Sequence, residues 1–343
     1  PGSGPPDTGS MWSVCALRAT EPARPTSGAR PAAGAEVIAS FSIQASLSDA
    51  ASWRARARAA EDAGFACLSI ADHPGSTAAP FVALAAAAAV TARIRLAPAV
   101  VNAGLWEPLT LAREIATLDV VSDGRATLGI GAGHTPGEWH HVGAARPSPG
   151  ARIERVGVVI DAVRRLLAGE RVTVDRSGVH LRGAQLEPPW VRPGIPVTVG
   201  GNAVALVQLA TACADRVELT GLGRTLPDGH AHEPLWDDTN VDRRMRIATS
   251  ARLDVGVLVQ TLQLTDDRQG AAAAYRDRLA EVLDPQALPS VGDLLATPFV
   301  LVGTCAEIAA QLQAWRRRWG LAHFTIREES FDDGARLIQH LRR

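Results

Sequence analysis

From residue 37 to its end, the chain alternates short apolar runs with segments of helical pattern, and this alternation restricts the fold more than any other feature. The apolar runs are nearly continuous, which is typical of parallel strands covered on both faces. Eight strands are predicted, at residues 37–44, 65–72, 94–101, 126–131, 196–201, 216–220, 253–263 and 322–326. Helices are predicted at 48–63, 79–91, 108–122, 152–168, 203–214, 241–250, 271–283, 306–319 and 332–341.

Eight strand–helix units over about 300 residues predict an α/β fold, a (β/α)8 TIM barrel with insertions in the loops of its C-terminal rim. The alternative is an open, doubly wound sheet, which usually has a glycine-rich phosphate turn after its first strand. The stretch IQASLSDA (43–50) has no glycine at that place. We therefore predict one barrel domain over residues 36–343. Residues 1–35, dominated by proline, glycine, serine and alanine, are predicted to be a disordered leader or extension.

The sequence contains no lysine, so all 35 of its basic residues are arginine. This absence excludes P-loop nucleotide hydrolases, Schiff-base aldolases and pyridoxal-phosphate enzymes, because each needs a lysine amine. The net charge of −1 gives no field that favours nucleic acid or an anionic membrane. No apolar run reaches the ~18 residues of a membrane span. We expect a soluble, cytoplasmic protein with a small-molecule substrate and with neither a nucleic-acid nor a membrane partner.

Three glycines, Gly129, Gly131 and Gly133, stand at the end of the fourth predicted strand. A dinucleotide fingerprint G-x-G-x-x-G would need a glycine at the sixth position and a helix that starts there. His134 occupies that position, and Pro136–Gly137 prevents an immediate helix, so the stretch is not a Rossmann motif. Because barrel enzymes carry their chemistry at the carboxyl ends of the strands, we predict that these glycines let a planar ligand or a phosphate approach the backbone.

Two other predicted strands also end in residue types that bind phosphate or transfer protons. Gly200–Gly201–Asn202 follows the fifth strand directly before a helix, where free N–H groups and the helix dipole favour a bound phosphate. His73 follows the second strand and is predicted to act as an acid or base, or to donate to a cofactor ring. The alternative is that His73 caps a helix or bonds to Asp72, which is itself predicted to orient its neighbours.

The rim loops carry further polar and aromatic side chains whose roles stay open. His134 and Glu138 flank the glycine loop, and they either contact a cofactor or substrate or form a solvated pair. Trp106, Trp139 and Trp236 either stack on a flat ring or anchor their loops.

Histidines also cluster at His140–His141 and in GHAHEP (229–234), residue types that bind metals. A metal-dependent amidohydrolase barrel, however, needs a His-x-His at the end of its first strand. Gln44 and Ser46 stand there instead, so no metal is predicted.

Taken together, long stretches of the chain resemble the bacterial-luciferase-like oxidoreductases, which use flavin or deazaflavin coenzymes. The matching stretches include AGFACLSIADH, PLTLAREIATLDVVSDGRATLGIGAGHTPGEW and IPVTVGGNAVALVQLATACADRV. With TARIRLAPAVVN, RIERVGVVIDAVRRLL and LVGTCAEIAAQLQAWRRRWGLAHFTI they cover residues 36–343 in order. The segment ELTGLGRTLPDG resembles the branch that uses coenzyme F420, a 5-deazaflavin.

The resemblance implies a barrel that binds its coenzyme ring at the C-terminal mouth, backed by a non-prolyl cis peptide at or near Ala99–Val100. His73 matches a histidine that aids hydride transfer in some deazaflavin members, and it is the predicted catalytic residue. The residues predicted to bind the cofactor are Ala99, Val100 and Asn102 on the third strand, Gly131, Gly133 and His134 after the fourth, and Gly200, Gly201, Asn202 and Thr220 near the phosphate.

We therefore expect an oxidoreductase that transfers a hydride between F420 and a small organic substrate. The alternatives are an FMN-dependent luciferase-like monooxygenase and a barrel that binds a flavin without turnover. A homodimer is expected by family analogy alone. The chain departs from the family's pattern at His134, which replaces an aromatic or acidic residue. It departs again at Glu218, which replaces a small one and either points outward or narrows the pocket.

Overall fold

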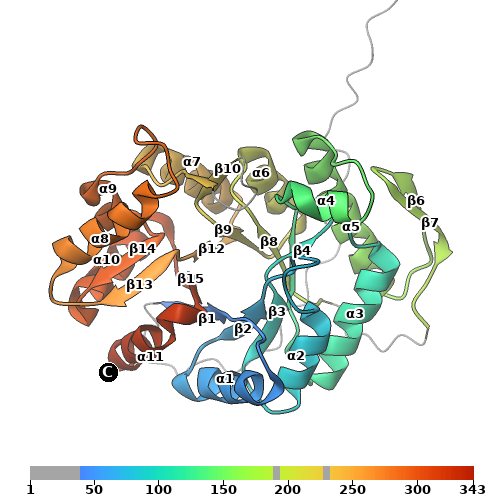
Figure 1. The fold of residues 1–343 in the computed structure, drawn as a ribbon. Coiled ribbons are helices and arrows are strands. Elements are labelled where there is room, and N and C mark those ends of the chain that lie inside the picture. The colour runs from blue at the N-terminus through green and yellow to red at the C-terminus, as the bar shows by residue number, and fades with distance from the viewer. Residues whose placement is uncertain (1–38, 188–193, 227–231) are drawn as a thin grey trace, which may run out of the picture.

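A computed structural model describes residues 39–187, 194–226 and 232–343 of the chain. Parallel strands form a nearly closed barrel, and helices surround it (Figure 1). The order of hydrogen-bonded strands is β3-β2-β1-β15-β12-β9-β8-β5-β4, and a bridge between Leu96 and Ala126 joins the two sides that remain. The strands are β1 (Ser40–Gln44), β2 (Cys67–Ile70), β3 (Arg95–Pro98), β4 (Val101–Asn102), β5 (Leu128–Gly131), β8 (Val197–Gly200), β9 (Arg216–Leu219), β12 (Asp254–Leu258) and β15 (His323–Arg327).

This barrel confirms the predicted fold, and the alternative of an open sheet is wrong. The segments β3 and β4 are two parts of the predicted third strand, separated at the cis peptide bond Ala99–Val100. The prediction of one strand over 253–263 is also wrong. The chain leaves the barrel after Leu258, and β13 (Thr261–Leu264) pairs with β14 (Val300–Gly303) in a separate sheet. A continuous apolar run cannot show such a change of sheet, because both segments are buried.

When β3 and β4 are taken as one strand, eight barrel strands alternate with eight helices on the outer face. Helix ends follow the expected local signals: Asp49 accepts from the N–H groups of Ala51 and Ser52 at the start of α1, and Gly64 ends it at a φ of 87°. The eight helices of this ring are α1 (Ala50–Ala63), α2 (Pro80–Ala88), α3 (Pro108–Val121), α5 (Pro149–Leu167), α6 (Val204–Cys213), α7 (Asp238–Ser250), α10 (Cys305–Trp319) and α11 (Phe331–Leu341). Among the described helices, none is both long and apolar enough to cross a membrane.

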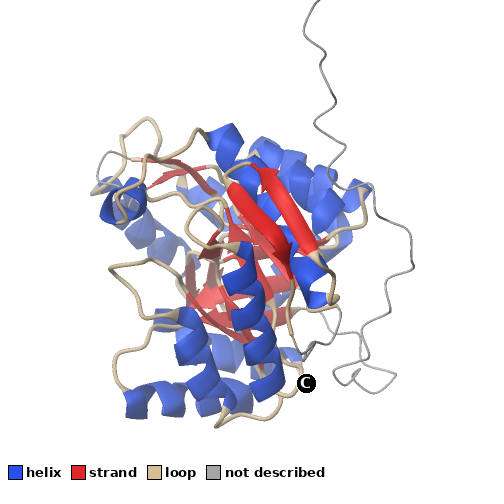
Figure 2. Cartoon of the chain, turned by 90° about the vertical axis from the view of Figure 1, so that its right-hand side faces the viewer, coloured by secondary structure: helices blue, strands red, loops and turns tan. Residues whose placement is uncertain are grey.

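Insertions interrupt the strand–helix repeat, mostly at the C-terminal side of the strands. The antiparallel hairpin β6–β7 packs on the outside of α5 and α3 (Figures 1 and 2). The predicted leader and part of GHAHEP lie outside the described residues. The inserted elements are α4 (Pro136–His141), β6 (Val172–Arg176), β7 (Val179–Ala184), β10 (Leu222–Thr225), β11 (His232–Pro234), α8 (Arg268–Ala280), α9 (Val291–Ala296) and the 3₁₀ turn Glu328–Ser330.

The side chains of β15 show how each strand divides its residues between the helical layer and the barrel lumen. Phe324 and Ile326 are fully buried in the hydrophobic core. Because side chains alternate along a strand, His323, Thr325 and Arg327 point to the opposite face, which is the lumen. The lumen face of this strand is therefore entirely polar, whereas barrel interiors are usually filled by bulky branched side chains.

Polar contacts cross the lumen between strands that are not neighbours. The Thr325 hydroxyl donates to Glu218 over 2.5 Å, and Arg216 contacts the ring of His323 over 3.1 Å. Gly256 on β12 lies between these strands, and a Cβ atom there would reach His323 and Arg216 at ordinary van der Waals distance. Glu218 thus points inward and narrows the lumen below the mouth, where burial raises the pKa of its carboxyl group.

Candidate active site

The mouth of the barrel contains a histidine–carboxylate pair built from three loops. His73, after β2, contacts Glu138 of α4 with 2.6 Å between Nδ1 and Oε1. The other carboxylate oxygen accepts from Nδ2 of Asn102, at the end of β4, over 2.8 Å. The amide oxygen of Asn102 in turn accepts from the backbone N–H of Gly104 over 2.9 Å. Glu138 and Asn102 are only 4% and 3% exposed, so the pair is held from below by a rigid, buried support.

The hydrogen bonds to Glu138 decide which nitrogen of His73 carries the proton. Burial alone would raise the pKa of Glu138, but the hydrogen bonds from His73 and Asn102 outweigh it and hold that pKa below its usual value. An ionised carboxylate accepts only, so Nδ1 of His73 must donate. No described residue bonds to Nε2, which is left for a ligand. The ring is 35% exposed and is therefore accessible from the mouth.

Two more histidines continue from His73 across the mouth. The His73 and His134 rings meet edge to face with centroids 5.3 Å apart, and His134 meets His232 of β11 at 4.8 Å. Partial burial, together with the charges of the neighbouring histidines, lowers the pKa of His134 to about 4. His134 is therefore neutral at neutral pH, and its contact with His232 brings the β10–β11 hairpin to the site.

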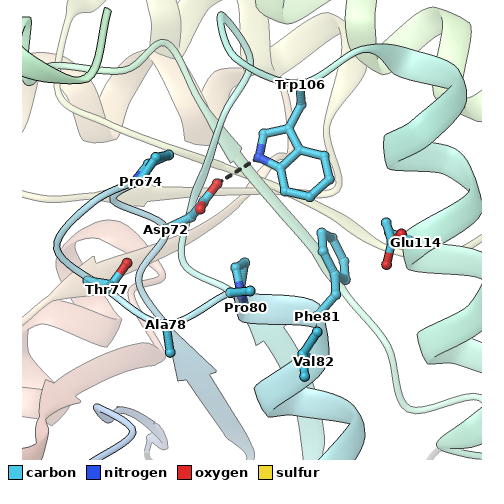
Figure 3. Close-up of a pocket in the computed structure, with 10 residues that line it drawn as sticks. Asp72, Pro74, Thr77, Ala78, Pro80, Phe81, Val82, Trp106 and Glu114 are labelled. Carbon is cyan, nitrogen blue, oxygen red and sulfur yellow. Dashed lines mark hydrogen bonds between the residues drawn. The ribbon is translucent and has the colours of Figure 1, made fainter. Parts of the chain in front are cut away.

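Asp72 lies behind His73 and bonds to the rim loop that follows β4. Its carboxylate accepts from the Trp106 indole over 2.7 Å, as the close-up shows (Figure 3). Burial, and to a smaller extent the charge of Glu138, raises the pKa of Asp72. Trp106 and Phe81, whose ring centroids lie 5.3 Å apart, line a cavity of about 360 Å³ beside the start of α2 (Figure 3). Asp72 therefore orients a loop, as the sequence predicts.

The three rim tryptophans anchor loops in this structure. Trp106 bonds to Asp72, Trp139 is 2% exposed, and Trp236 is 5% exposed and stacks on Tyr275 with a centroid distance of 6.3 Å. Trp139 and Trp236 are too buried to stack on a ligand without a rearrangement of their loops, whereas Trp106 lines the cavity beside α2.

The glycines at and after the ends of β5 and β8 lie against neighbouring side chains. A Cβ atom on Gly131 or on Gly200 would come within 2.7 Å of a Val100 methyl group, and one on Gly133 would collide with Trp139 and Asn102. These glycines thus make room for protein side chains. The space that their missing side chains leave is filled by Val100, Trp139 and Asn102, and the contact of these glycines with a ligand stays a prediction.

Val100 follows a peptide bond in the cis conformation. The Ala99–Val100 bond is cis, where the resemblance places such a bond, and the Ala99 carbonyl accepts from Nε2 of Gln44 over 2.8 Å. Gln44 ends β1, so this hydrogen bond connects the interrupted third strand to the first strand across the mouth.

The turn between β8 and α6 has the features of an anion site. Both amide atoms of Asn202 are buried and make no hydrogen bond within the described part of the chain. Ala203 offers no side chain to cap the first N–H groups of α6. The carbonyl of Asn202 accepts from Nε of Arg244 over 2.6 Å. Arg244 is 5% exposed, and its side chain forms no ion pair with the described residues.

Thr220 lies above Glu218 on the same side of the mouth, at the end of β9. Its hydroxyl accepts from the N–H of Leu222 over 3.3 Å, and its carbonyl accepts from Nε2 of Gln260 over 3.0 Å. The structure thus distributes the predicted residues over two groups. One surrounds His73 and Val100, and the other surrounds Asn202 and Thr220.

Sequence reasoning missed some of the groups that hold the site together. It left the role of Glu138 open, and no local pattern shows that a residue 65 positions from His73 contacts it. Arg155 of α5 has the spacing of an ordinary helix residue, yet it is 8% exposed and bonds to the Ala103 carbonyl and to Glu107. Arg327 could have been identified from the sequence, because the alternation of side chains along the last strand places residue 327 on the lumen face.

The chain belongs to the luciferase-like monooxygenase family, whose model matches residues 29–323. The F420-dependent glucose-6-phosphate dehydrogenase of Beutenbergia cavernae is 34% identical over 178 residues, which cover 49% of this chain and 52% of that protein. The chain spans about half or less of the length of the curated relatives that it matches.

Two solved structures show the same fold. An F420-dependent secondary alcohol dehydrogenase, in complex with an F420–acetone adduct, has a TM-score of 0.67 at 18% identity and covers 88% of this chain and 98% of its own. The monooxygenase RslO1 from Streptomyces bottropensis has a TM-score of 0.64 at 24% identity and covers 88% of this chain and 96% of its own. These relatives include both F420-dependent enzymes and a monooxygenase.

Proposed function

We propose that this protein is an F420-dependent oxidoreductase that passes a hydride between the deazaflavin and a small organic substrate. The observation that carries this proposal is the His73–Glu138 pair at the mouth. Oxidation of an alcohol, or reduction of a carbonyl, moves a proton at the oxygen while a hydride moves at the carbon. A histidine with one nitrogen fixed by an ionised carboxylate and the other free is suited to move that proton.

The residues present fit a coenzyme with a phosphate-bearing tail. Within the described part of the chain, the amide of Asn202 has no partner, α6 starts without a side-chain cap, and Arg244 has no ion pair, so together they offer donors and positive charge to an anion. We propose that Gly200, Gly201 and Asn202 hold the phosphate and that Thr220 borders it. Ala99, Val100, Gly131, Gly133 and His134 would form the surface behind the ring. Bound F420 would supply the hydride acceptor or donor.

The chain's own residues then have separate tasks. His73 takes a proton at Nε2 in oxidation and returns it in reduction. Glu138 keeps Nδ1–H in place and stabilises the imidazolium that forms, because its carboxylate is ionised. Asn102 fixes the carboxylate. The neutral His134 and the β10–β11 hairpin border the site and reduce its contact with water.

Coenzyme titration tests this proposal directly. The purified chain is titrated with F420 and, separately, with FMN, and binding is followed by coenzyme fluorescence. We expect tight binding of F420, followed by a change in its absorbance on addition of a panel of small alcohols and hydroxy acids. Tight FMN binding with oxygen-dependent turnover would instead assign the FMN monooxygenase alternative. Binding without turnover by wild type on any substrate of the panel would favour a flavin-binding barrel.

A further inference from the structure

Arg327 is a cation in the mouth that the proposed function does not use. It ends β15 on the lumen face, above Thr325 and His323 on the same strand. Its place is therefore at the carboxyl end of the barrel, where His73 also lies, and two strands away from β2 in the sheet order. A charged side chain at this place needs either a partner or a ligand.

The guanidinium group is held by two neutral amides. Its Nη1 donates to Oε1 of Gln44 over 3.3 Å and its Nη2 to Oε1 of Gln260 over 3.0 Å. Both amides are fixed from behind, since Gln44 donates to the Ala99 carbonyl over 2.8 Å and Gln260 to the Thr220 carbonyl over 3.0 Å. This chain of hydrogen bonds crosses the mouth from the third strand to the sixth, and it fixes the position of the charge without neutralising it.

No acidic side chain compensates this charge within the described part of the chain. Glu328, the next residue, turns away and contacts Arg56 at 3.3 Å and the Ser46 N–H at 2.9 Å. Glu218 lies deeper in the lumen, and burial raises its pKa toward the neutral form. Only two of the five guanidinium N–H groups have acceptors among the described residues, so the remaining ones are available.

We infer that Arg327, positioned by Gln44 and Gln260, binds an oxyanion of the substrate, a carboxylate or a phosphate monoester. The planar guanidinium binds such groups through paired, charge-assisted hydrogen bonds. This inference rests on the proposed function. The substrate is an organic anion whose oxyanion binds Arg327, while His73 exchanges a proton with the reacting oxygen. The coenzyme's phosphate, by contrast, is assigned to the turn at Asn202.

Calorimetric titration of the full chain with benzoate and with phenyl phosphate, with and without F420, tests this inference. Benzyl alcohol is the neutral control probe. We expect one or both anions to bind, and Arg327→Gln to weaken that binding tenfold or more, the loss typical of a charge-assisted hydrogen bond. Arg327→Lys keeps the positive charge but not the paired donors of the planar guanidinium, and it should weaken anion binding less than Arg327→Gln does. Arg336→Gln, on the exposed side of α11, is the matched control and should leave the affinity unchanged.

A second variant keeps the arginine in place. Gln260→Glu puts a carboxylate against Arg327 and should weaken anion binding as strongly as Arg327→Gln does, while thermal unfolding shows that both variants fold. Unchanged anion affinity in both variants, or the absence of anion binding to wild type in either state, would overturn the inference. So would a loss of F420 affinity alone in Arg327→Gln, because Arg327 would then bind the coenzyme. If neither coenzyme binds but the anion effect persists, the proposed function fails and the oxyanion site stands.

Discussion

The two ends of the barrel lumen use the same kinds of side chain in opposite ways. At the N-terminal end, Arg216 lies 3.1 Å from His323, and Asp254 lies 4.0 and 3.9 Å from these two. Nearby, Arg95 donates to the hydroxyl of Thr127 over 3.1 Å. Charged groups at this end contact one another, and Asp254 offers a negative charge to Arg216 and His323, although Nε of Arg216 is buried without a hydrogen-bond partner among the described residues.

At the C-terminal mouth, polar groups are held firmly but left incomplete. Among the described residues, His73 has a fixed Nδ1 and a free Nε2, Asn202 has an amide without partners, and Arg327 has a charge without a carboxylate. Buried polar groups without partners cost free energy, and a ligand at the mouth would complete the amide of Asn202. The difference indicates that the base of the lumen serves stability and the mouth serves binding and chemistry.

The largest expected effect comes from His73→Gln. The glutamine amide can still donate to Glu138, so the support stays intact, but it cannot exchange a proton. We expect turnover on the best substrate of the alcohol and hydroxy-acid panel to fall ~10²–10⁴-fold, with unfolding free energy within about 1 kcal/mol of wild type. His340→Gln, an exposed histidine of α11, is the control. Equal turnover in the two variants would remove His73 from the mechanism.

The next effect comes from Glu138→Gln, which removes the charge behind His73 at constant volume. Without the ionised acceptor, Nδ1 of His73 no longer has to carry the proton. We expect turnover to fall about 10–100-fold, as for other residues that orient a catalytic histidine, with F420 affinity unchanged. Nitrogen-15 shifts of the His73 ring should show the Nδ1–H form in wild type and a mixture in the variant. A single unchanged tautomer would contradict this role.

Asn202→Asp tests the second incomplete group of the mouth. It places a negative charge where we propose that the coenzyme phosphate binds. We expect F420 affinity, measured by fluorescence titration, to fall about tenfold, the size of one lost or opposed hydrogen bond to a charged group. Gln208→Glu adds the same charge to an exposed position on α6, away from its start, and should change little. A similar loss in both variants would point to a general effect of charge rather than to a site.

The base and the mouth also differ in how far the sequence predicts them. Strand positions followed from apolar runs because each run needs cover on both faces, which is a local property. The predicted placement of His73, Gly200 and Asn202 at the mouth follows from the same rule, since parallel strands of a barrel end at one face. These positions could be located before any contact was known.

Contacts between distant segments could not be located in this way. The pairing of His73 with Glu138, and of Glu218 with Thr325, depends on how loops and alternating strands meet in space. The glycines show the same limit: their spacing indicated close approach, but the approaching group is Val100 of a neighbouring strand. Sequence spacing shows where space is needed, and only the fold shows what fills it.

The smallest expected effect concerns His323, at the N-terminal end of the lumen, and is measured as a loss of stability at acidic pH. Burial and the nearby Arg216 lower the pKa of His323 to about 3, below the usual 6.5. As the pH falls below about 6.5, this histidine binds a proton in the unfolded chain but not in the folded protein. The free energy of unfolding therefore decreases toward acidic pH. Between about pH 6.5 and pH 5, this histidine should cost about 1 kcal/mol of unfolding free energy, allowing for its partial exposure. His323→Gln still offers an acceptor to Arg216 and should flatten that part of the denaturant-derived stability profile, whereas His340→Gln should not. An unchanged slope in His323→Gln would mean that the base of the lumen is open enough for this ring to titrate as in water.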